Sequence, residues 1–265
     1  MEVFINGIGM LGPGFNGWEE ARRLLETPSQ WCFAPTRLPP AERLPPAERR
    51  RASRIIRATL AAGEEAVFAA GEDPAQLASV FASSSGDGQS CHDICEALAS
   101  PRRLISPTGF HNSVHNVAAG YWSIAMAAMA PAAVLCAYDA SFAAGLLEAV
   151  TQVQATAAPV LLFAYDTHYP EPLHTARPVP DTFAVALVLA PVRSARTIGA
   201  LRLSAQTALT QATPTKIADA PLEALRLAIP AARCLPLLQL LGSRRCATVV
   251  IEYLAPLALE LEVSP

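Results

Sequence analysis

The chain has 265 residues, of which 52% are hydrophobic and 16% are charged, so it can bury a sizeable core in one large or two small domains. Its formal net charge is −3 and its pI is about 6.0, which excludes the strongly basic surface that nucleic-acid binding requires. The six cysteines are spread along a sequence that opens without a charged, apolar, cleavable leader. This usage predicts a reducing, cytoplasmic location.

The first 51 residues predict a strand, a turn and a helix, followed by an irregular segment. Residues 3–5 are apolar and extended in character, residues 7–14 are rich in glycine, and residues 18–25 place apolar side chains at helical spacing. Residues 38–43 are then repeated at once as residues 44–49, each copy reading Leu-Pro-Pro-Ala-Glu-Arg. Because paired prolines remove amide donors, we expect residues 34–51 to form an exposed loop.

The middle of the chain predicts a helix over residues 53–70, a strand over 80–82 and a polar turn over 83–88. Residues 117–138 contain no charged side chain, and a stretch of this length could cross a membrane as a helix. The segment is mostly alanine and is interrupted by Gly120, Ser123 and Pro131, whereas a spanning helix is usually rich in leucine, isoleucine and phenylalanine. We therefore predict a buried helix, a turn at Pro131 and a central strand, and no membrane span.

The last third of the chain predicts several further strands. Residues 159–164 and 183–190 are apolar without polar alternation, as in a sheet covered on both faces. Strands are also expected over residues 198–203 and 248–254, with residues 258–263 as a hairpin partner. The alternation of strands and helices indicates an α/β architecture.

Several segments, taken in chain order, resemble the first half of a β-ketoacyl-acyl-carrier-protein synthase. They are the opening strand and glycines, the helix around residues 54–57, the turn at residues 84–88, Ile105-Ser106-Pro107, Asn116-Val117-Ala118-Ala119-Gly120 and the run from Ala132 to Ser141. Ordered agreement is more specific than a single motif, and it spans roughly two thirds of the chain. The resemblance implies a thiolase-like, layered αβαβα fold in a single domain, residues 1–265. In it, residues 1–193 would form a complete N-terminal half and residues 194–265 a shortened C-terminal half.

The resemblance also places Asp139 at the position of the nucleophilic cysteine of the family. There, a cysteine sits at the tip of a helix, whose dipole favours the thiolate. A carboxylate is a poor acyl acceptor, because the mixed anhydride that it would form is itself an activated acyl group. The two histidine motifs that assist condensation in the family are missing as well, since no histidine follows His174. We therefore expect no catalytic residue, no cofactor and no metal.

Relatives with this pattern are chain-length factors, which pair with an active ketosynthase and shape its acyl tunnel. A short form accompanies aryl polyene and xanthomonadin-type pigment synthesis, and the resemblance favours that branch. It implies a heterodimer with a ketosynthase, with an acyl carrier protein as a further partner through the complex. The residues expected at the interface and tunnel come from the segment around residues 110–122 and from the end of the following strand: Phe110, His111, Val114, His115, Asn116, Tyr121, Trp122, Tyr138 and Phe142.

Two other functions stay open at this stage. In the first, Asp139 acts as a general acid or base on a carrier-bound acyl group, for example in decarboxylation. In the second, the chain is a purely structural subunit that stabilises its partner without touching the tunnel. An interface helix left open would form a large apolar patch, so an obligate partner is expected. A homodimer is the alternative to the heterodimer.

The remaining motifs favour structural roles. The pattern Gly7-x-Gly9-x-x-Gly12 follows a strand and could bind a dinucleotide, but Pro13 and Gly14 delay the helix that should face the pyrophosphate, so we predict a tight structural turn. Cys136 is predicted to lie buried within the strand as a small apolar side chain.

Cys91, His92 and Cys95 form half of a zinc motif, and no second pair completes it. His111 and His115 lack the glutamate of a zinc-protease helix, so packing at the partner interface is the plainer interpretation. Ser141 lies outside the G-x-S-x-G elbow that a serine hydrolase requires.

Overall fold

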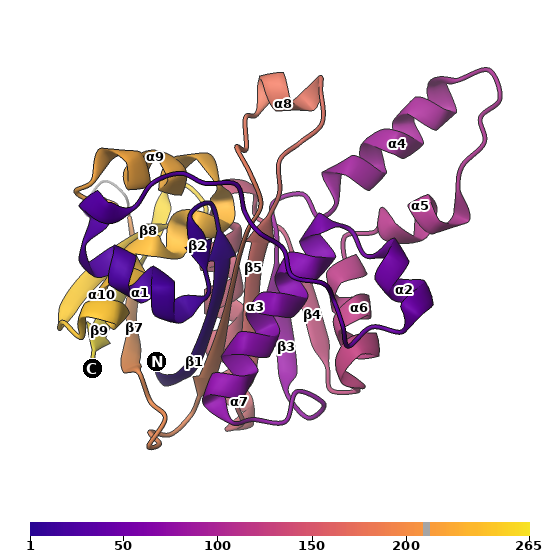
Figure 1. The fold of residues 1–265 in the computed structure, drawn as a ribbon. Coiled ribbons are helices and arrows are strands. Elements are labelled where there is room, and N and C mark those ends of the chain that lie inside the picture. Colours follow the sequence, from indigo (N-terminus) through magenta and orange to yellow (C-terminus); the bar gives the residue numbers. More distant parts are fainter. Residues whose placement is uncertain (209–212) are drawn as a thin grey trace.

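The computed structural model describes residues 1–208 and 213–265, and for residues 204–208 it describes the backbone alone. The described residues form a single mixed sheet of nine strands, in the order β4-β3-β5-β6-β1-β7-β9-β8, with the short β2 paired to β1. Figure 1 shows helices on both sides of this sheet, and an arm that carries α4 and α5 away from the body. The α/β fold class expected from the sequence is confirmed.

The central strand β1 (Glu2–Gly12) is longer than predicted and contains the glycines that were expected to form a turn. A Cβ atom on Gly7 would lie 2.1 Å from the carbonyl oxygen of Ala66, and one on Gly9 would lie 1.9 Å from that of Ala62. Both glycines therefore let helix α3 (Arg54–Ala70) approach the strand backbone. The predicted turn is confined to Pro13 and Gly14, between β1 and β2, and the prediction is wrong for residues 7–12. Gly7 and Gly9 serve close helix packing rather than a pyrophosphate.

The segment between β1 and β3 matches the predictions in its helices and departs from them in its loop. Helix α1 (Trp18–Glu26) and helix α3 begin and end within one residue of the predicted ranges. Within the repeat, Ala41 and Leu44 are buried, and the second copy starts helix α2 (Pro46–Arg51). Proline suits the first turn of a helix because its missing N–H would have no partner there, so the expected exposed loop is only partly correct. A short 3-10 turn, η1 (Pro28–Gln30), precedes this segment.

Three parallel strands form one end of the sheet. Strand β3 (Ala78–Ala82) lies between β4 (Ala132–Leu135) and β5 (Val160–Asp166). Between β3 and β5 the chain forms α4 (Gly88–Ala99), α5 (Pro107–Asn112), α6 (Val117–Met126), the turn η2 (Tyr138–Ala140) and α7 (Ser141–Thr156). Strand β4 ends the sheet, so one of its edges is unpaired within the described chain.

The C-terminal part extends the same sheet beyond β1. Strand β6 (Phe183–Ala190) is antiparallel to both β5 and β1, and β7 (Gly199–Ala208) is antiparallel to β1 and β9. The predicted hairpin of β8 (Ala247–Glu252) and β9 (Leu257–Ser264) is confirmed. The remaining elements are α8 (Leu173–Ala176), α9 (Ala220–Ala228), η3 (Pro230–Cys234) and α10 (Leu235–Ser243).

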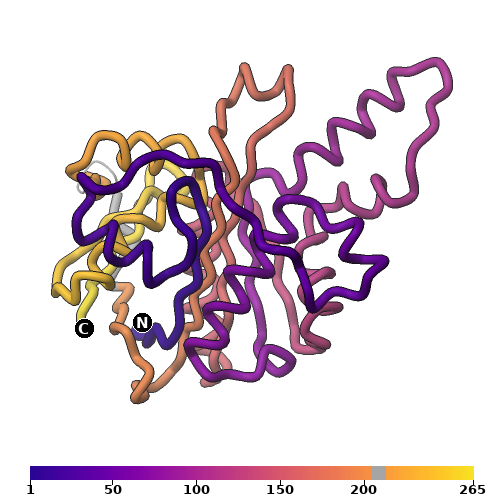
Figure 2. The backbone as a smooth tube through the Cα atoms, viewed as in Figure 1, coloured from indigo at the N-terminus to yellow at the C-terminus, as the bar shows by residue number. Residues whose placement is uncertain are grey.

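The core divides into two apolar clusters on opposite faces of the sheet. One cluster joins α7, α10 and α1 to side chains of β1, β5, β6, β7, β8 and β9. The other joins α3 and α6 to β3, β5 and β6, and in Figure 2 the tube of α3 can be followed in front of the sheet. Strands β5 and β6 are buried along their whole length, as their uninterrupted apolar sequences predicted. Within the described residues, no helix is long and apolar enough to span a membrane.

The packing of β1 on α3 gives a first testable prediction. Replacing Gly9 by alanine should destabilise the protein by about 1–3 kcal/mol or more, because the new methyl group would overlap the backbone of α3. The matched control is Gly120→Ala in α6, where a Cβ atom meets nothing within 4 Å. That change should stabilise the protein by about 0.5–1 kcal/mol. Urea unfolding measures both, and equal effects at the two positions would contradict the packing argument.

Candidate functional site

The position singled out by the sequence lies at an elbow between strand β4 and helix α7. The strand ends at Leu135, and helix α7 begins at Ser141. Between them, Tyr138 has a φ angle of 53°, a left-handed conformation that a bulky residue seldom adopts. The Ser141 hydroxyl supports this backbone, because it donates to the carbonyl of Tyr138 at 2.7 Å and accepts from the N–H of Ala137 at 3.1 Å. The elbow therefore carries its backbone strain at Tyr138, one residue before Asp139.

The carboxylate of Asp139 is engaged by arginines rather than free. Arg177 places Nη2 2.5 Å from Asp139 Oδ1, and Arg233 lies 4.0 Å from Oδ2. The guanidinium carbon of Arg177 also lies 3.6 Å from the centre of the Tyr138 ring. Arg177 comes from the segment between α8 and β6, which Figure 1 shows projecting at the same end of the sheet as the arm. Both side chains of the elbow tip are thus held by one cation.

A second, fully buried carboxylate anchors the loop beside the elbow. Asp166 Oδ1 accepts hydrogen bonds from the N–H and hydroxyl of Ser84, at 2.8 and 2.7 Å. Its Oδ2 accepts from the N–H of Ala231 in η3 at 2.8 Å. Burial raises the pKa of Asp166 to about 6, although these hydrogen bonds and the field of Arg177 act in the opposite direction. Asp166 therefore ties the end of β3 to the C-terminal part of the chain.

Cys136 lies outside the strand that was predicted to bury it. Strand β4 ends one residue earlier, and the Cys136 side chain is exposed and directs its thiol to the carbonyl of Ser84 at 3.1 Å. The prediction of a buried, intra-strand cysteine is wrong, because β4 is an edge strand and is only four residues long.

The predicted interface residues divide into two groups by burial. The first group is open to solvent: the side chain of His115 is half-buried, and the exposed ones are Phe110, His111, Val114, Asn116 and Tyr138. The half-buried His115 ring lies 3.2 Å from the carbonyl of Ser83 through Nε2. The exposed set remains available to a partner.

The other three predicted residues belong to the core of this chain. Trp122 is 1% exposed and packs edge-on against Phe163, with ring centres 5.0 Å apart. Tyr121 is also 1% exposed and donates its hydroxyl to Asn112, and Phe142 is completely buried. The inward face of α6 rests on α3 and the sheet, so only the opposite face of this helix is left for a partner.

Exposed apolar side chains are concentrated around the arm and the edge strand. More than half of the large apolar side chains that are exposed in the described residues fall between residues 98 and 138: Leu98, Leu104, Ile105, Phe110, Val114, Ile124, Met129 and Tyr138. We call this set the apolar face. Exposed apolar side chains and an unpaired strand edge, as at β4, are both features that mark protein interfaces.

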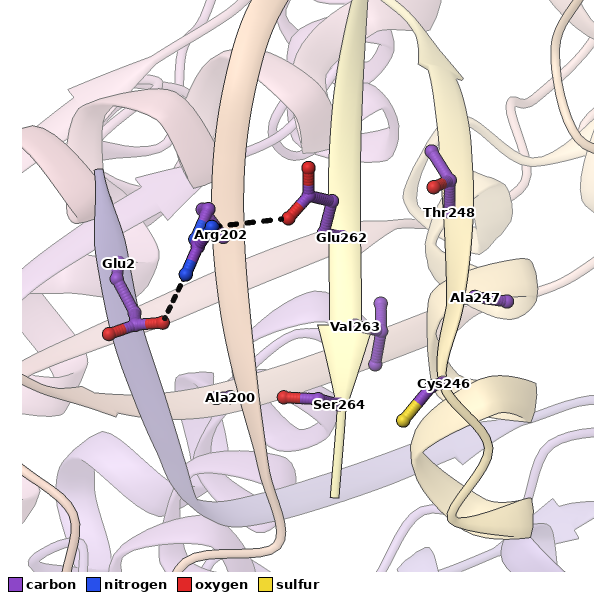
Figure 3. Close-up of a pocket in the computed structure, with 9 residues that line it drawn as sticks. All are labelled: Glu2, Ala200, Arg202, Cys246, Ala247, Thr248, Glu262, Val263 and Ser264. Atoms are coloured by element: carbon purple, nitrogen blue, oxygen red, sulfur yellow. Dashed lines mark ion pairs between the residues drawn. The ribbon is translucent and has the colours of Figure 1, made fainter.

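A separate cavity lies far along the sheet from the elbow, on the open face of the C-terminal strands. Its volume is about 430 Å³, and Figure 3 shows Arg202 between Glu2 and Glu262 across three neighbouring strands. The two ion pairs measure 3.5 and 3.6 Å and are exposed, so they contribute little to stability. No elbow residue lines this cavity.

The described residues hold no group of three His, Cys, Asp or Glu side chains that could bind a metal ion. Cys91 and Cys95 are exposed on α4, and His92 pairs with Glu96 at 3.3 Å. The geometry thus supplies no third ligand to the half motif in that helix.

Residues 18–234 match the family model for the β-ketoacyl synthase N-terminal domain. The chain belongs to the β-ketoacyl synthase family. The matched region includes the elbow, the apolar face, Asp166 and Arg177. A search of curated proteins gives no match.

Solved structures of ketosynthases share the fold of this ketosynthase-family chain. The complex of the ketosynthase ApeO with its chain length factor ApeC from Xenorhabdus doucetiae contains a chain with 21% identity and a TM-score of 0.75, and the alignment covers 99% of both chains. The ishigamide ketosynthase/chain length factor aligns at 14% identity, with a TM-score of 0.71, over 99% of this chain and 98% of the other. A β-ketoacyl synthase from Burkholderia phymatum aligns at 15% identity, with a TM-score of 0.61, over 88% of this chain and 70% of the other. The thiolase-like fold expected from the sequence is confirmed.

The sequence analysis did not identify two residues of this candidate site, Asp166 and Arg177. Asp166 could have been found, because an acid at the end of a buried apolar strand is unusual and suggests a hydrogen-bonded role. Arg177 lies in a proline-rich segment without periodicity, and nothing in the sequence links it to Asp139.

The buried carboxylate gives a second testable prediction. The folded protein binds the Asp166 proton more tightly than the unfolded chain, whose carboxyl has a pKa of about 4. The free energy of unfolding should therefore lose about 1–3 kcal/mol as the pH rises from about 4 to about 6, and this loss should level off above that range. In Asp166→Asn the loss should vanish. Urea titrations at several pH values measure the difference between the two proteins, and equal pH profiles would contradict the assignment.

Proposed function

We propose that this chain is a chain-length factor, a ketosynthase-family subunit without condensing activity that pairs with an active ketosynthase and shapes its acyl tunnel. The observation that carries the proposal is the elbow. Where the family places a nucleophilic cysteine, this chain has Tyr138 and Asp139, and Arg177 contacts both. An ion-paired carboxylate neither accepts an acyl group nor abstracts a proton readily.

The apolar face supports a stable partner. Exposed side chains such as Phe110, at 61%, and Met129, at 92%, lie in the same part of the chain as the unpaired edge of β4. Burying such side chains in an interface removes apolar area from water, and this stabilises the complex by about 25 cal/mol for each Å² buried. Similar solved structures are described as a ketosynthase in complex with its chain length factor, and we infer the same kind of partner here.

Finer assignments extend this proposal. The family resemblance favours a role in aryl polyene or xanthomonadin-type pigment synthesis. We infer an acyl carrier protein as a further partner, because the similar AntDE:AntF structure contains a type II polyketide synthase acyl-carrier protein in complex with its ketosynthase. The six free cysteines favour a reducing cytoplasmic location.

An experiment can distinguish the proposed function from the alternative in which Asp139 acts as an acid or base. This chain is co-expressed with an active ketosynthase from the same organism, and the purified assembly is tested for its mass and for condensation. We expect a one-to-one complex that is active only when both subunits are present. Asp139→Asn should retain at least half of the activity, whereas changing the partner's nucleophilic cysteine to alanine should abolish it. A tenfold or larger loss in Asp139→Asn, within an intact complex, would favour the enzymatic alternative.

The interface also has a testable consequence. Placing a charge at the apolar face by Phe110→Asp should weaken association with the ketosynthase at least tenfold, because a desolvated carboxylate would have no partner there. Phe68→Asp is the matched control, since Phe68 is 87% exposed on α3 and outside the apolar face. Association is measured by sedimentation or mass photometry. Equal behaviour of the two variants would place the interface elsewhere.

A further inference from the structure

The contact between Arg177 and Tyr138 is not explained by the loss of a nucleophile. An inactive elbow needs no cation, and Asp139 is 51% exposed, so water could solvate its carboxylate without Arg177. Arg177 is nevertheless largely enclosed by its surroundings, with only 19% of its side chain exposed. Its guanidinium lies over the Tyr138 ring at 3.6 Å and near the Tyr169 ring at 6.0 Å.

This arrangement fixes a ring that would otherwise be mobile. Tyr138 is 61% exposed, and few contacts would restrain such a side chain in the isolated subunit. Its backbone conformation is already defined by the left-handed φ angle and by the Ser141 hydroxyl. A guanidinium stacked on one face of the ring adds a cation–π attraction of about 0.5–2 kcal/mol, and the ion pair to Asp139 fixes the guanidinium in turn.

The fixed ring lies three residues beyond the last residue of β4, the strand whose edge is unpaired. A partner that pairs with this edge or covers the apolar face would meet Tyr138 at the elbow end. Arg177 occupies one face of the Tyr138 ring, so the opposite face is free to contact an apolar group. A rigid aromatic surface limits the length of an acyl chain more sharply than a mobile one, because it cannot move aside to admit another unit.

On the basis of the function proposed above, we propose that Arg177 is a positioning residue that holds Tyr138 as a fixed stop for the apolar acyl chain growing on the partner ketosynthase. Tyr138 contacts the end of the chain, and Arg177 acts only through Tyr138 and Asp139. Asp139 itself serves as the anchor of the guanidinium, which explains an acid at this position without any acid or base chemistry.

The test uses the reconstituted complex and measures the distribution of product lengths by mass spectrometry. Tyr138→Ala should lengthen the main product by at least one two-carbon unit, while Tyr138→Phe should leave it unchanged because the ring is retained. Arg177→Ala should shift the products in the same direction and broaden their distribution. Arg177→Lys keeps a cation for Asp139 but loses the planar stacking, so its products should lie between those of Arg177→Ala and the unchanged protein.

Two further variants separate positioning from general structural damage. The double variant Tyr138→Ala with Arg177→Ala should give the same products as Tyr138→Ala alone, because Arg177 has no ring left to hold. Arg193→Ala is the matched control, since Arg193 lies over the ring of Phe4 at 5.5 Å on another part of the surface. It should leave the product lengths unchanged.

The outcomes distinguish this inference from the proposed function. If the unchanged chain fails to form an active complex, the proposed function fails and the stop fails with it. If the complex forms and is active but Arg177→Ala and Arg177→Lys leave the products unchanged, only the role of Arg177 is overturned. Additive effects of the two single changes in the double variant would likewise show that Arg177 does not act through Tyr138.

Discussion

The hydrogen bonding of the buried Asp166 carboxylate holds together the parts of this fold that make the site. One oxygen accepts hydrogen bonds from the N–H and the hydroxyl of Ser84 at the end of β3, and the other accepts a hydrogen bond from the N–H of Ala231 in η3. Burying a carboxylate is costly unless its hydrogen bonds are satisfied, so the loop after β3 and the turn η3 must be in place together. The carbonyl oxygen of Ser84 in turn accepts a hydrogen bond from the thiol of Cys136 at the start of the elbow. The position of the elbow thus depends on a contact between segments 65 residues apart.

In the proposed function, the elbow keeps the backbone of an active-site turn while the side chains at its tip differ. The strand, the strained residue and the following helix form a sharp turn whose tip carries a tyrosine and an ion-paired aspartate. Because Arg177 pairs with the Asp139 carboxylate, the proposed function assigns the tip a role through its shape. As proposed above, the chain acts on the reaction through the surface that it offers to its partner.

The fold was largely predictable because it depends on patterns that are local in the sequence. The apolar runs of β5 and β6, the helical spacing of α1 and α3, and the β8–β9 hairpin were all expected. The glycines of β1 were misinterpreted as a turn because their purpose is a contact with α3, which begins more than 40 residues later. The second copy of the proline repeat became a helix because Pro46 occupies the first helical position.

For the site, the sequence by itself determined the family resemblance, the acid at Asp139 and the absence of later histidines. It could not decide which side of α6 would be free, because Tyr121 and Trp122 are as apolar as the residues that remain exposed. Only the tertiary structure turned them into the core, through packing against α3 and β5. The same holds for Arg177, whose partner is 38 residues away along the chain. Local patterns encode elements, whereas ion pairs and burial between distant segments exist only once the chain has folded.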